Sequence, residues 1–233
     1  METLLKELAK KINIDLTDEV TDKFFLYKKL LLEWNEKINL TAITDEKEIL
    51  IKHFIDSLTI EKYIPRNAKI IDVGTGAGFP GIPLKIVRPD IEVVLLDSLN
   101  KRINFLNEII RECQLDKITT IHGRAEEIAN KSEYREKFDI STARAVANIS
   151  TLSELCTPFL KVGGSFVCMK ADAVEEMKNA KNALEILGMK EEKIEHIILP
   201  NIDATRTIIL YKKEKNTPKK YPRKHGTPAK EPL

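Results

Sequence analysis

The chain has 233 residues, of which 42% are hydrophobic and 32% are charged. This length allows one well-buried α/β domain with a modest extension, and the composition is that of an ordinary soluble protein. The sequence has no apolar run of the roughly 18 residues that cross a bilayer, and its N-terminus lacks the basic start and apolar core of a signal peptide. We therefore expect a cytoplasmic protein with no membrane partner.

Three cysteines, Cys113, Cys156 and Cys168, lie far apart in the chain. Their odd number and wide separation predict neither a disulfide framework nor a zinc site, so we expect no bound metal. The three thiols are expected to be reduced and packed in or near the core.

The net charge of +2 at pH 7 hides an uneven distribution of charge. Residues 212–233 carry eight Lys or Arg residues and only two Glu residues, whereas the rest of the chain is slightly acidic. A basic end on a nearly neutral body indicates a polyanionic partner; a solvated tail that only aids solubility is the alternative. Because residues 213–233 also hold four prolines and show no apolar period, we expect a basic, extended tail there.

Residues 1–64 are expected to form a helical extension. From Thr17 onward, apolar residues recur every three or four positions, which is the period of one helix face. These residues are Val20, Phe24, Tyr27, Leu31, Trp34 and Ile38. Thr17 is a suitable N-cap for this long helix. A shorter helix is expected over residues 3–11, and Asp45 with Glu48 predicts a capping box at the start of a third helix.

Beyond residue 65, short apolar runs alternate with helix-length segments, which indicates a parallel, doubly wound sheet. The predicted strands span residues 69–73, 91–96, 117–122, 138–143, 165–170, 193–199 and 206–212. Helices are expected to begin near Pro80, Asn100, Ala125 and Asn148, and a further helix over residues 173–187 ends at Gly188. The last two strands are too close in sequence for a parallel crossover, so the sheet must finish with an antiparallel pair. We expect residues 65–212 to form this mostly parallel, seven-stranded α/β domain.

Residues 69–81 combine a buried strand that ends in Asp72 with a glycine-rich run. The run is Gly74-Thr75-Gly76-Ala77-Gly78-Phe79-Pro80-Gly81. Alternating glycines allow a tight turn and bring backbone N–H groups close to a ligand, because no Cβ stands in the way. Pro80 suits the first turn of the helix that follows. A strand, a glycine loop and a helix start together predict a site for a nucleotide-like ligand.

Two classes of ligand fit such a loop. Gly76, Gly78 and Gly81 satisfy the dinucleotide fingerprint, and Asp97 after the second strand could bind a ribose of NAD. Asp72 argues against NAD, because the first strand of a dinucleotide site runs apolar into its turn. The antiparallel finish of the sheet also argues against NAD. The two strand-end acids and the glycines together resemble the class I methyltransferases, in which this loop binds S-adenosylmethionine and the second acid takes the ribose hydroxyls.

Longer segments narrow the resemblance. They are 33–43 (EWNEKINLTAI), 53–58 (HFIDSL), 72–81 (DVGTGAGFPG), 123–126 (GRAE), 143–147 (ARAVA), 221–224 (YPRK) and 226–228 (GTP). In this order, over nearly the whole chain, they resemble the bacterial ribosomal small-subunit methyltransferase G family, formerly called glucose-inhibited division protein B. Thr75 replaces the family's usual Ser, Ala171 a common Gly, and His225 a small residue. These departures remove no group that the chemistry obviously needs.

The resemblance implies the Rossmann-like class I methyltransferase fold and transfer of a methyl group from S-adenosylmethionine to N7 of one guanine in 16S ribosomal RNA. By position, the family implies cofactor contacts at Gly74, Phe79, Ala125, Glu126 and Arg144. The class I pattern adds Gly76, Gly78 and Asp97 as cofactor-binding residues. For Glu126, a helix N-terminal acid that interacts with the helix dipole is an equally good interpretation.

The residues after the fourth strand bear on the mechanism. Ser141-Thr142-Ala143-Arg144 stands where amine methylases carry an Asn/Asp-Pro-Pro-aromatic tetrad, and none of the cysteines follows a proline as the cytosine C5 nucleophile commonly does. Guanine N7 has a lone pair and no proton to lose, so the reaction needs no general base and catalysis is mainly placement. We assign no catalytic residue. Arg144 is the candidate, and we expect it to pair with the cofactor, the RNA or a structural carboxylate, because an unpaired buried guanidinium is costly.

Lys219, Lys220, Arg223 and Lys224 in the tail are expected to contact RNA phosphates. The substrate is 16S ribosomal RNA, either free or within the small ribosomal subunit, and we expect a monomeric enzyme.

The two histidines near these motifs, His53 and His122, are interpreted as structural residues first. Two other functions stay open: an NAD-dependent oxidoreductase, and a non-enzymatic RNA-binding protein on a methyltransferase-like fold.

Overall fold

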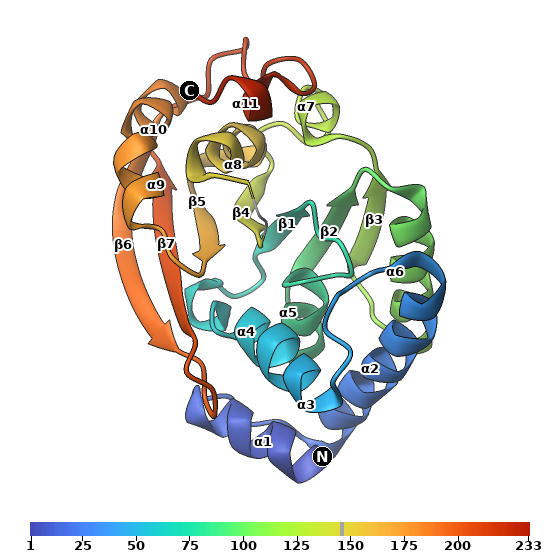
Figure 1. Cartoon of the computed structure of the whole chain (residues 1–233). Coiled ribbons are helices and arrows are strands. Elements are labelled where there is room, and N and C mark those ends of the chain that lie inside the picture. Colours follow the sequence, from blue (N-terminus) through green and yellow to red (C-terminus); the bar gives the residue numbers. More distant parts are fainter. Residues whose placement is uncertain (145–146) are drawn as a thin grey trace.

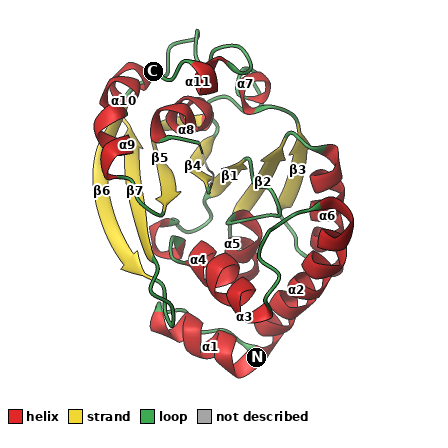
Figure 2. Cartoon of the chain, viewed as in Figure 1, coloured by secondary structure: helices red, strands yellow, loops and turns green. Residues whose placement is uncertain are grey.

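The computed structural model describes residues 1–144 and 147–233. Ala145 and Val146, which belong to the matched segment after the fourth predicted strand, lie outside the described residues. A seven-stranded sheet forms the centre of the molecule and helices cover both of its faces (Figures 1 and 2). The two termini lie at opposite ends of the molecule (Figure 1).

The sheet has the strand order β3-β2-β1-β4-β5-β7-β6. Its strands are β1 (Lys69–Val73), β2 (Glu92–Asp97), β3 (Ile118–His122), β4 (Phe138–Ala143), β5 (Leu160–Lys170), β6 (Met189–Ile198) and β7 (Thr205–Lys213). Strands β1 to β5 pair in parallel, and β7 runs antiparallel to both β5 and β6. The predicted sheet is confirmed. Because the strand order reverses between β1 and β4, their carboxyl ends form the crevice where open α/β sheets bind ligands.

The helical extension lies against one face of this sheet. It comprises α1 (Glu2–Lys11), α2 (Asp18–Ile38), α3 (Glu46–Glu48), the π-helix η1 (Ile49–Ile55), α4 (Asp56–Leu58) and the 3-10 helix η2 (Glu61–Tyr63). Thr17 caps α2 by accepting the N–H of Val20, and Asp45 caps α3 by accepting the N–H of Glu48 at 2.8 Å. Both predicted N-caps are confirmed. The third helix, however, continues through η1, whose wider turn the apolar period did not predict.

The core divides into two clusters, one on each face of the sheet. Phe24 and Tyr27 of α2 and Phe54 of η1 are fully buried with residues of β1 and β2 such as Ile70. The opposite cluster joins the sheet to the helices that follow β4 and β5. All three cysteines are buried and none is in a disulfide, as predicted.

The helices that connect the strands begin close to the predicted residues. They are α5 (Gly81–Val87), α6 (Asn100–Glu112), α7 (Ala125–Ile128), α8 (Ile149–Cys156), the 3-10 helix η3 (Thr157–Phe159), α9 (Val174–Asn179) and α10 (Lys181–Leu187). The single helix predicted over residues 173–187 is wrong, because a turn at buried Ala180 divides it into α9 and α10, which both contact α8. Gly188 ends α10 in the left-handed conformation, as predicted.

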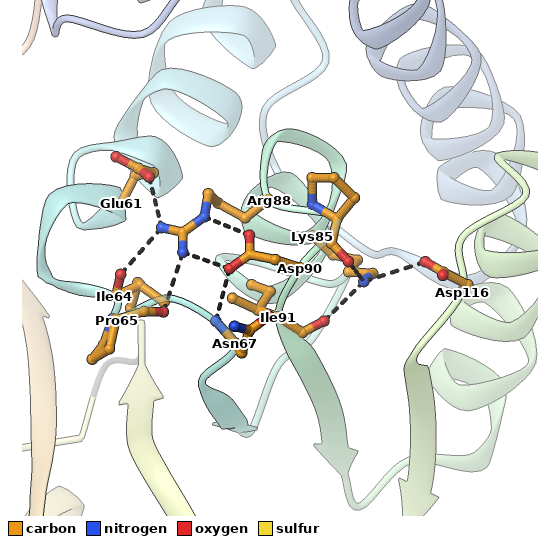
Figure 3. A network of polar contacts seen from close by, with 10 residues as sticks. Glu61, Ile64, Pro65, Asn67, Lys85, Arg88, Asp90, Ile91 and Asp116 are labelled. Atoms are coloured by element: carbon orange, nitrogen blue, oxygen red, sulfur yellow. Dashed lines mark hydrogen bonds and ion pairs between the residues drawn. The ribbon is translucent and has the colours of Figure 1, made fainter.

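An ion-pair network at the amino end of the sheet joins the helical extension to the sheet domain (Figure 3). The Arg88 guanidinium donates to Glu61 at 2.8 Å, to the carbonyl of Ile64 at 3.1 Å and to both carboxylate oxygens of Asp90 at 2.7 and 2.8 Å. Asp90 also accepts the N–H of Asn67 at 2.8 Å. Arg88 is the main reason that the pKa of Asp90 lies well below its usual value. The network leaves the opposite, ligand-binding edge of the sheet free.

The tail is folded against the body, so the prediction of an extended arm is wrong. The fully buried Glu154 of α8 accepts the backbone N–H of Arg223 at 2.7 Å and its guanidinium at 2.7 and 3.0 Å. Thr151 donates its hydroxyl to the carbonyl of Pro228 at 2.9 Å, and Tyr221 is buried. The tail ends in a short helix, α11 (Thr227–Lys230), beside α7 and α8 (Figure 1). A buried carboxylate needs a cation, and the tail supplies it.

Candidate cofactor and active site

The carboxylate of Asp72 organises the glycine loop (residues 74–81). Asp72 ends β1 without exposed surface, and its Oδ2 accepts the hydroxyl of Thr75 at 2.7 Å and the N–H of Gly81 at 2.8 Å. Its other oxygen, Oδ1, is buried and has no partner among the described residues. Burial raises the pKa of Asp72 to about 6, although both hydrogen bonds oppose this shift. The acid therefore fixes the loop and leaves one acceptor available.

The glycines of the loop divide into two kinds. At Gly78 and Gly81 a Cβ would come within 3 Å of neighbouring side chains, so packing requires glycine at both positions, and Gly78 also has a positive φ of 97°. At Gly74 and Gly76 a Cβ would meet nothing within 4 Å, and both residues have positive φ, 70° and 63°. The backbone of these two residues thus borders open space at the carboxyl end of β1. This is the close approach that a nucleotide-like ligand needs.

Asp97 at the end of β2 faces the same loop. Its Oδ2 accepts the N–H of Gly76 at 2.9 Å, and its Oδ1 accepts the N–H of Leu99 at 2.9 Å. Arg102 lies 3.3 Å from Oδ2. Oδ2 thus has two donors, whereas Oδ1 can accept a second hydrogen bond. The open backbone at Gly74 and Gly76, the available oxygen of Asp72 and the carboxylate of Asp97 therefore fit S-adenosylmethionine, whose ribose hydroxyls and ammonium group are hydrogen-bond donors.

Arg144, which follows β4, binds a structural carboxylate. Its guanidinium donates to Asp56 at 3.2 Å and to the carbonyl of Lys52 at 3.1 Å, and it lies 4.7 Å from the ring centre of Phe79. Asp56 is buried and also accepts from Arg206 of β7 at 3.0 Å. The arginine thus joins the helical extension, the glycine loop and β4. Of the three partners considered for Arg144, the structure shows the structural carboxylate.

His53 is a packing residue that stays neutral. Its ring stacks on Phe79 with centres 4.5 Å apart and accepts from Arg144 at Nδ1 (3.2 Å), which leaves Nε2–H to donate to the Thr41 hydroxyl at 2.8 Å. Burial, with a smaller effect of the Arg144 charge, lowers the pKa of His53 to about 3. The structural interpretation of His53 agrees with these contacts. His122 ends β3 and contacts the carbonyl of Ser98 at 3.1 Å.

Ala125 and Glu126 begin α7 directly after β3, at the same edge of the sheet as Asp97. The carboxylate of Glu126 is engaged with the tail: it accepts the N–H of Gly226 at 3.2 Å and lies 3.3 Å from Nδ1 of His225. The structure therefore gives Glu126 a tail contact that neither sequence-based interpretation included. Ala125, at the start of α7, is buried.

A cavity of about 410 Å³ opens at the ends of β4 and β5, on the opposite side of β1 from Asp97. We call it the β4–β5 cavity; it is lined by Asp56, Arg144, Met169, Lys170, Ala171, Asp172, Glu176 and Arg206. Lys170 is buried and donates to Glu176 and to the carbonyl of Ala147, both at 2.8 Å. This size suits a small ligand such as a nucleotide base.

Sequence reasoning missed most of the residues that line this cavity. Asp56 lies in the matched segment 53–58, but nothing in the sequence pairs it with Arg144. Arg206 had no signal at all, because its partner Asp56 is 150 residues away. A local apolar period identifies a buried face and carries no information about such distant polar pairs.

The predicted RNA-binding residues of the tail differ in their surroundings. Lys219, Lys220 and Lys224 are exposed. The Arg223 guanidinium is instead held by Glu154 and by the carbonyl of Glu231 at 2.7 Å. Its prediction as an RNA ligand is corrected to a structural role, since the buried carboxylate of Glu154 uses its charge.

In the part of the chain that the structure describes, no helix is long and apolar enough to cross a membrane.

The strand order, the antiparallel β7, the two strand-end acids and the open glycine loop define a class I methyltransferase. A solved structure, M. jannaschii TYW2 in complex with AdoMet, shares this fold with a TM-score of 0.53 at 16% identity, over 68% of this chain and 76% of that chain.

Comparison with protein families makes the assignment specific. Residues 20–205 match the family model described as rRNA small subunit methyltransferase G (GidB). The Ribosomal RNA small subunit methyltransferase G of Acetivibrio thermocellus is 56% identical over 231 residues, which cover 99% of this chain and 96% of the relative. The protein of the same name from Clostridium novyi is 52% identical, with 99% and 96% covered. The chain belongs to the rRNA small subunit methyltransferase G family, which confirms the resemblance stated from its motifs.

We predict that Gly76→Ala weakens binding of S-adenosylhomocysteine about tenfold or more, because the added methyl group enters the space that borders the loop. Isothermal titration measures this. Gly163→Ala is the matched control, since Gly163 also has positive φ (83°) and open space around its Cβ but lies on β5 outside the β4–β5 cavity. Both variants should lose about 1–2 kcal/mol of stability from backbone strain, and only Gly76→Ala should lose affinity. Equal affinities of the two variants would contradict this placement of the cofactor.

The raised pKa of Asp72 predicts that this residue destabilises the ligand-free protein to an extent that depends on pH. Because the folded-state pKa (about 6) exceeds the ordinary aspartate pKa of 3.8, the folded protein binds the proton more tightly, and stability is lost as pH rises through this window. Relative to wild type, Asp72→Asn should therefore become more stable by as much as about 3 kcal/mol between about pH 4 and pH 7. Urea unfolding at each pH measures this difference. Asp203→Asn, at an exposed loop residue, serves as control, and a flat difference for Asp72→Asn would refute the assignment.

Proposed function

We propose that the protein transfers a methyl group from S-adenosylmethionine to N7 of a specific guanine in 16S ribosomal RNA, as a cytoplasmic monomer that acts on the free RNA or the small ribosomal subunit. The observation that carries the proposal is the open glycine loop beside the β4–β5 cavity. Membership of the methyltransferase G family supports the substrate class. The NAD alternative loses support, because β7 lies antiparallel between β5 and β6 where a dinucleotide fold continues in parallel.

In this proposal the loop and strand-end acids hold the cofactor. Gly74 and Gly76 allow close approach, Asp97 accepts from the ribose hydroxyls, and Asp72 Oδ1 is the acceptor for the ammonium group. Phe79 stacks on His53 and also contacts the Arg144 guanidinium, and these contacts keep the wall of the site rigid. When bound, S-adenosylmethionine supplies an electrophilic methyl group. The remaining task of the protein is to place N7 in line with it, which can contribute several kcal/mol, up to roughly 10.

The surroundings of the cavity agree with a nucleophile that needs no base. Its described lining contains neither histidine nor cysteine, and two of its carboxylates, Asp56 and Glu176, are paired with cations. His53, the nearest imidazole of the arginine network, remains neutral and hydrogen-bonded on both nitrogens. Attack by N7 releases no proton, so no proton acceptor is required.

Transfer of labelled methyl from S-adenosylmethionine tests this function, with naked 16S RNA and with unmethylated small subunits as substrates. We expect the label in 7-methylguanosine after nucleoside digestion, from one position in the RNA, and a reduced rate with Gly76→Ala. Label in another nucleoside would overturn the N7 assignment. Binding of NAD in place of S-adenosylhomocysteine by isothermal titration would overturn the methyltransferase assignment altogether.

For RNA binding, we propose the exposed lysines of the tail, Lys219, Lys220 and Lys224. Their triple change to Gln should weaken binding of the RNA substrate and make its salt dependence shallower by as much as about 2 to 3 in slope, because up to three phosphate contacts are lost. Truncation of the tail would be a poor test, since it removes Arg223 and leaves Glu154 buried without its cation.

The matched control changes three exposed lysines outside the tail to Gln: Lys10, Lys47 and Lys117. Filter binding over a range of salt concentrations compares the two triple variants. If both show the same salt slope, the tail lysines do not contact phosphates.

A further inference from the structure

The β4–β5 cavity lies where the nucleophile must enter. The loop after β1 and Asp97 after β2 define the cofactor side, and Ala125 after β3 extends it away from β4. The cavity lies on the opposite side of β1, and Arg144 belongs to both regions because its guanidinium covers Phe79 of the loop and lines the cavity. A target base whose reacting atom faces the methyl donor at this boundary therefore places its opposite edge inside the cavity.

The chemistry of guanine determines what that far edge presents. N7 and O6 lie on one edge of the base. If N7 faces the methyl donor, the Watson–Crick edge with its two adjacent donors, N1–H and one N2–H, points into the cavity. A carboxylate matches two parallel donors with two oxygens and makes charge-assisted hydrogen bonds. Adenine has no N–H at N1 and no amino group at C2, so the same carboxylate discriminates against it.

Three carboxylates line the cavity, and their existing partners distinguish them. Asp56 uses Oδ1 for Arg206 and Oδ2 for Arg144. Glu176 is held by Lys170 and by the N–H of Ile149 at 3.0 Å. Both are therefore neutralised parts of the cavity wall.

The third carboxylate, Asp172, belongs to the turn directly after β5 and is exposed. Its Oδ1 accepts the N–H of Val174 at a long 3.2 Å, and no cation pairs with it among the described residues. This contact orients the side chain at the cavity while leaving its negative charge uncompensated.

We propose that Asp172 is the guanine-reading residue, which accepts N1–H and N2–H of the target base in the β4–β5 cavity. This inference rests on the proposed N7 transfer. As N7 forms its bond to the methyl carbon and the carbon–sulfur bond breaks, the positive charge of the sulfonium passes to the purine. N1–H and N2–H then become stronger donors, so the contact with Asp172 strengthens toward the transition state and accelerates the reaction as well as selecting the base.

Asp172→Asn tests the role with little risk to the fold, because the Asn side-chain oxygen can still accept the N–H of Val174. Glu175→Gln is the matched control: it removes the same charge from the neighbouring α9 at an exposed residue that does not line the cavity. The substrates are small subunits reconstituted with guanine or with inosine at the methylated position. Inosine lacks the N2 amino group and retains N1–H and N7.

Wild type and Glu175→Gln should lose about tenfold or more in kcat/KM on the inosine substrate, which corresponds to one charge-assisted hydrogen bond. Asp172→Asn should lose at least as much on guanine, mainly in kcat, and show little further loss on inosine. Affinity for the two subunits in the presence of S-adenosylhomocysteine gives a second readout, in which only Asp172→Asn should fail to distinguish guanine from inosine. Affinity for S-adenosylhomocysteine itself should be unchanged.

The inference is overturned if Asp172→Asn methylates guanine at the wild-type rate, or if it retains the full wild-type penalty for inosine. A wild-type enzyme that transfers no methyl to guanine N7 is a different result, because it refutes the proposed function before Asp172 is tested.

Discussion

The ligand-binding edge of this molecule depends on the buried carboxylate of Asp72. One of its oxygens holds Thr75 and Gly81 together across the glycine loop, and this fixes the path of the chain from β1 into α5. Burial of an acid is costly unless hydrogen bonds offset the cost. Here two donors compensate one oxygen, and the other oxygen is left without a partner in the described structure. The loop conformation that results leaves the backbone of Gly74 and Gly76 accessible and brings Gly76 within reach of Asp97.

A second constraint ties the helical extension to this edge. Arg144 binds Asp56 and the carbonyl of Lys52, which belongs to the π-helix η1. The wider turns of a π-helix are frequent at functional sites, and here they accompany carbonyl groups that accept from a guanidinium. Through Arg206 the same carboxylate reaches β7. The extension therefore forms one wall of the β4–β5 cavity, and removal of Arg144 would leave a buried acid with only one of its two cations.

Much of this arrangement could be predicted from the sequence, because it is encoded locally. Strand ends, the antiparallel finish and the N-caps at Thr17 and Asp45 depend on periodicity, loop length and single side chains within a few residues. Glycine and acid spacing predicted the loop, and the positions of Gly74 and Asp97 agree with it.

The features that could not be predicted depend on partners that are distant in sequence. Glu154 of α8 binds Arg223, 69 residues later, and this pair turns a tail with a disordered composition into a folded segment. The charge pattern of the tail is the same whether the tail is extended or folded, so composition could not distinguish these two states. The cavity has the same origin, since Asp56 and Arg206 come from opposite ends of the chain. A turn at Ala180 divides a helix that propensity favours, and the two halves, α9 and α10, both contact α8.

A crystal structure of the protein with S-adenosylhomocysteine would test the central claim most directly, namely that the glycine loop holds the cofactor with its sulfur end toward the β4–β5 cavity. We predict the adenine near Ala125, the ribose on Asp97, and the sulfur between Phe79 and the cavity that contains Asp172. Density elsewhere on the protein, or a bound molecule whose sulfur faces β3 and whose adenine fills the β4–β5 cavity, would contradict the account.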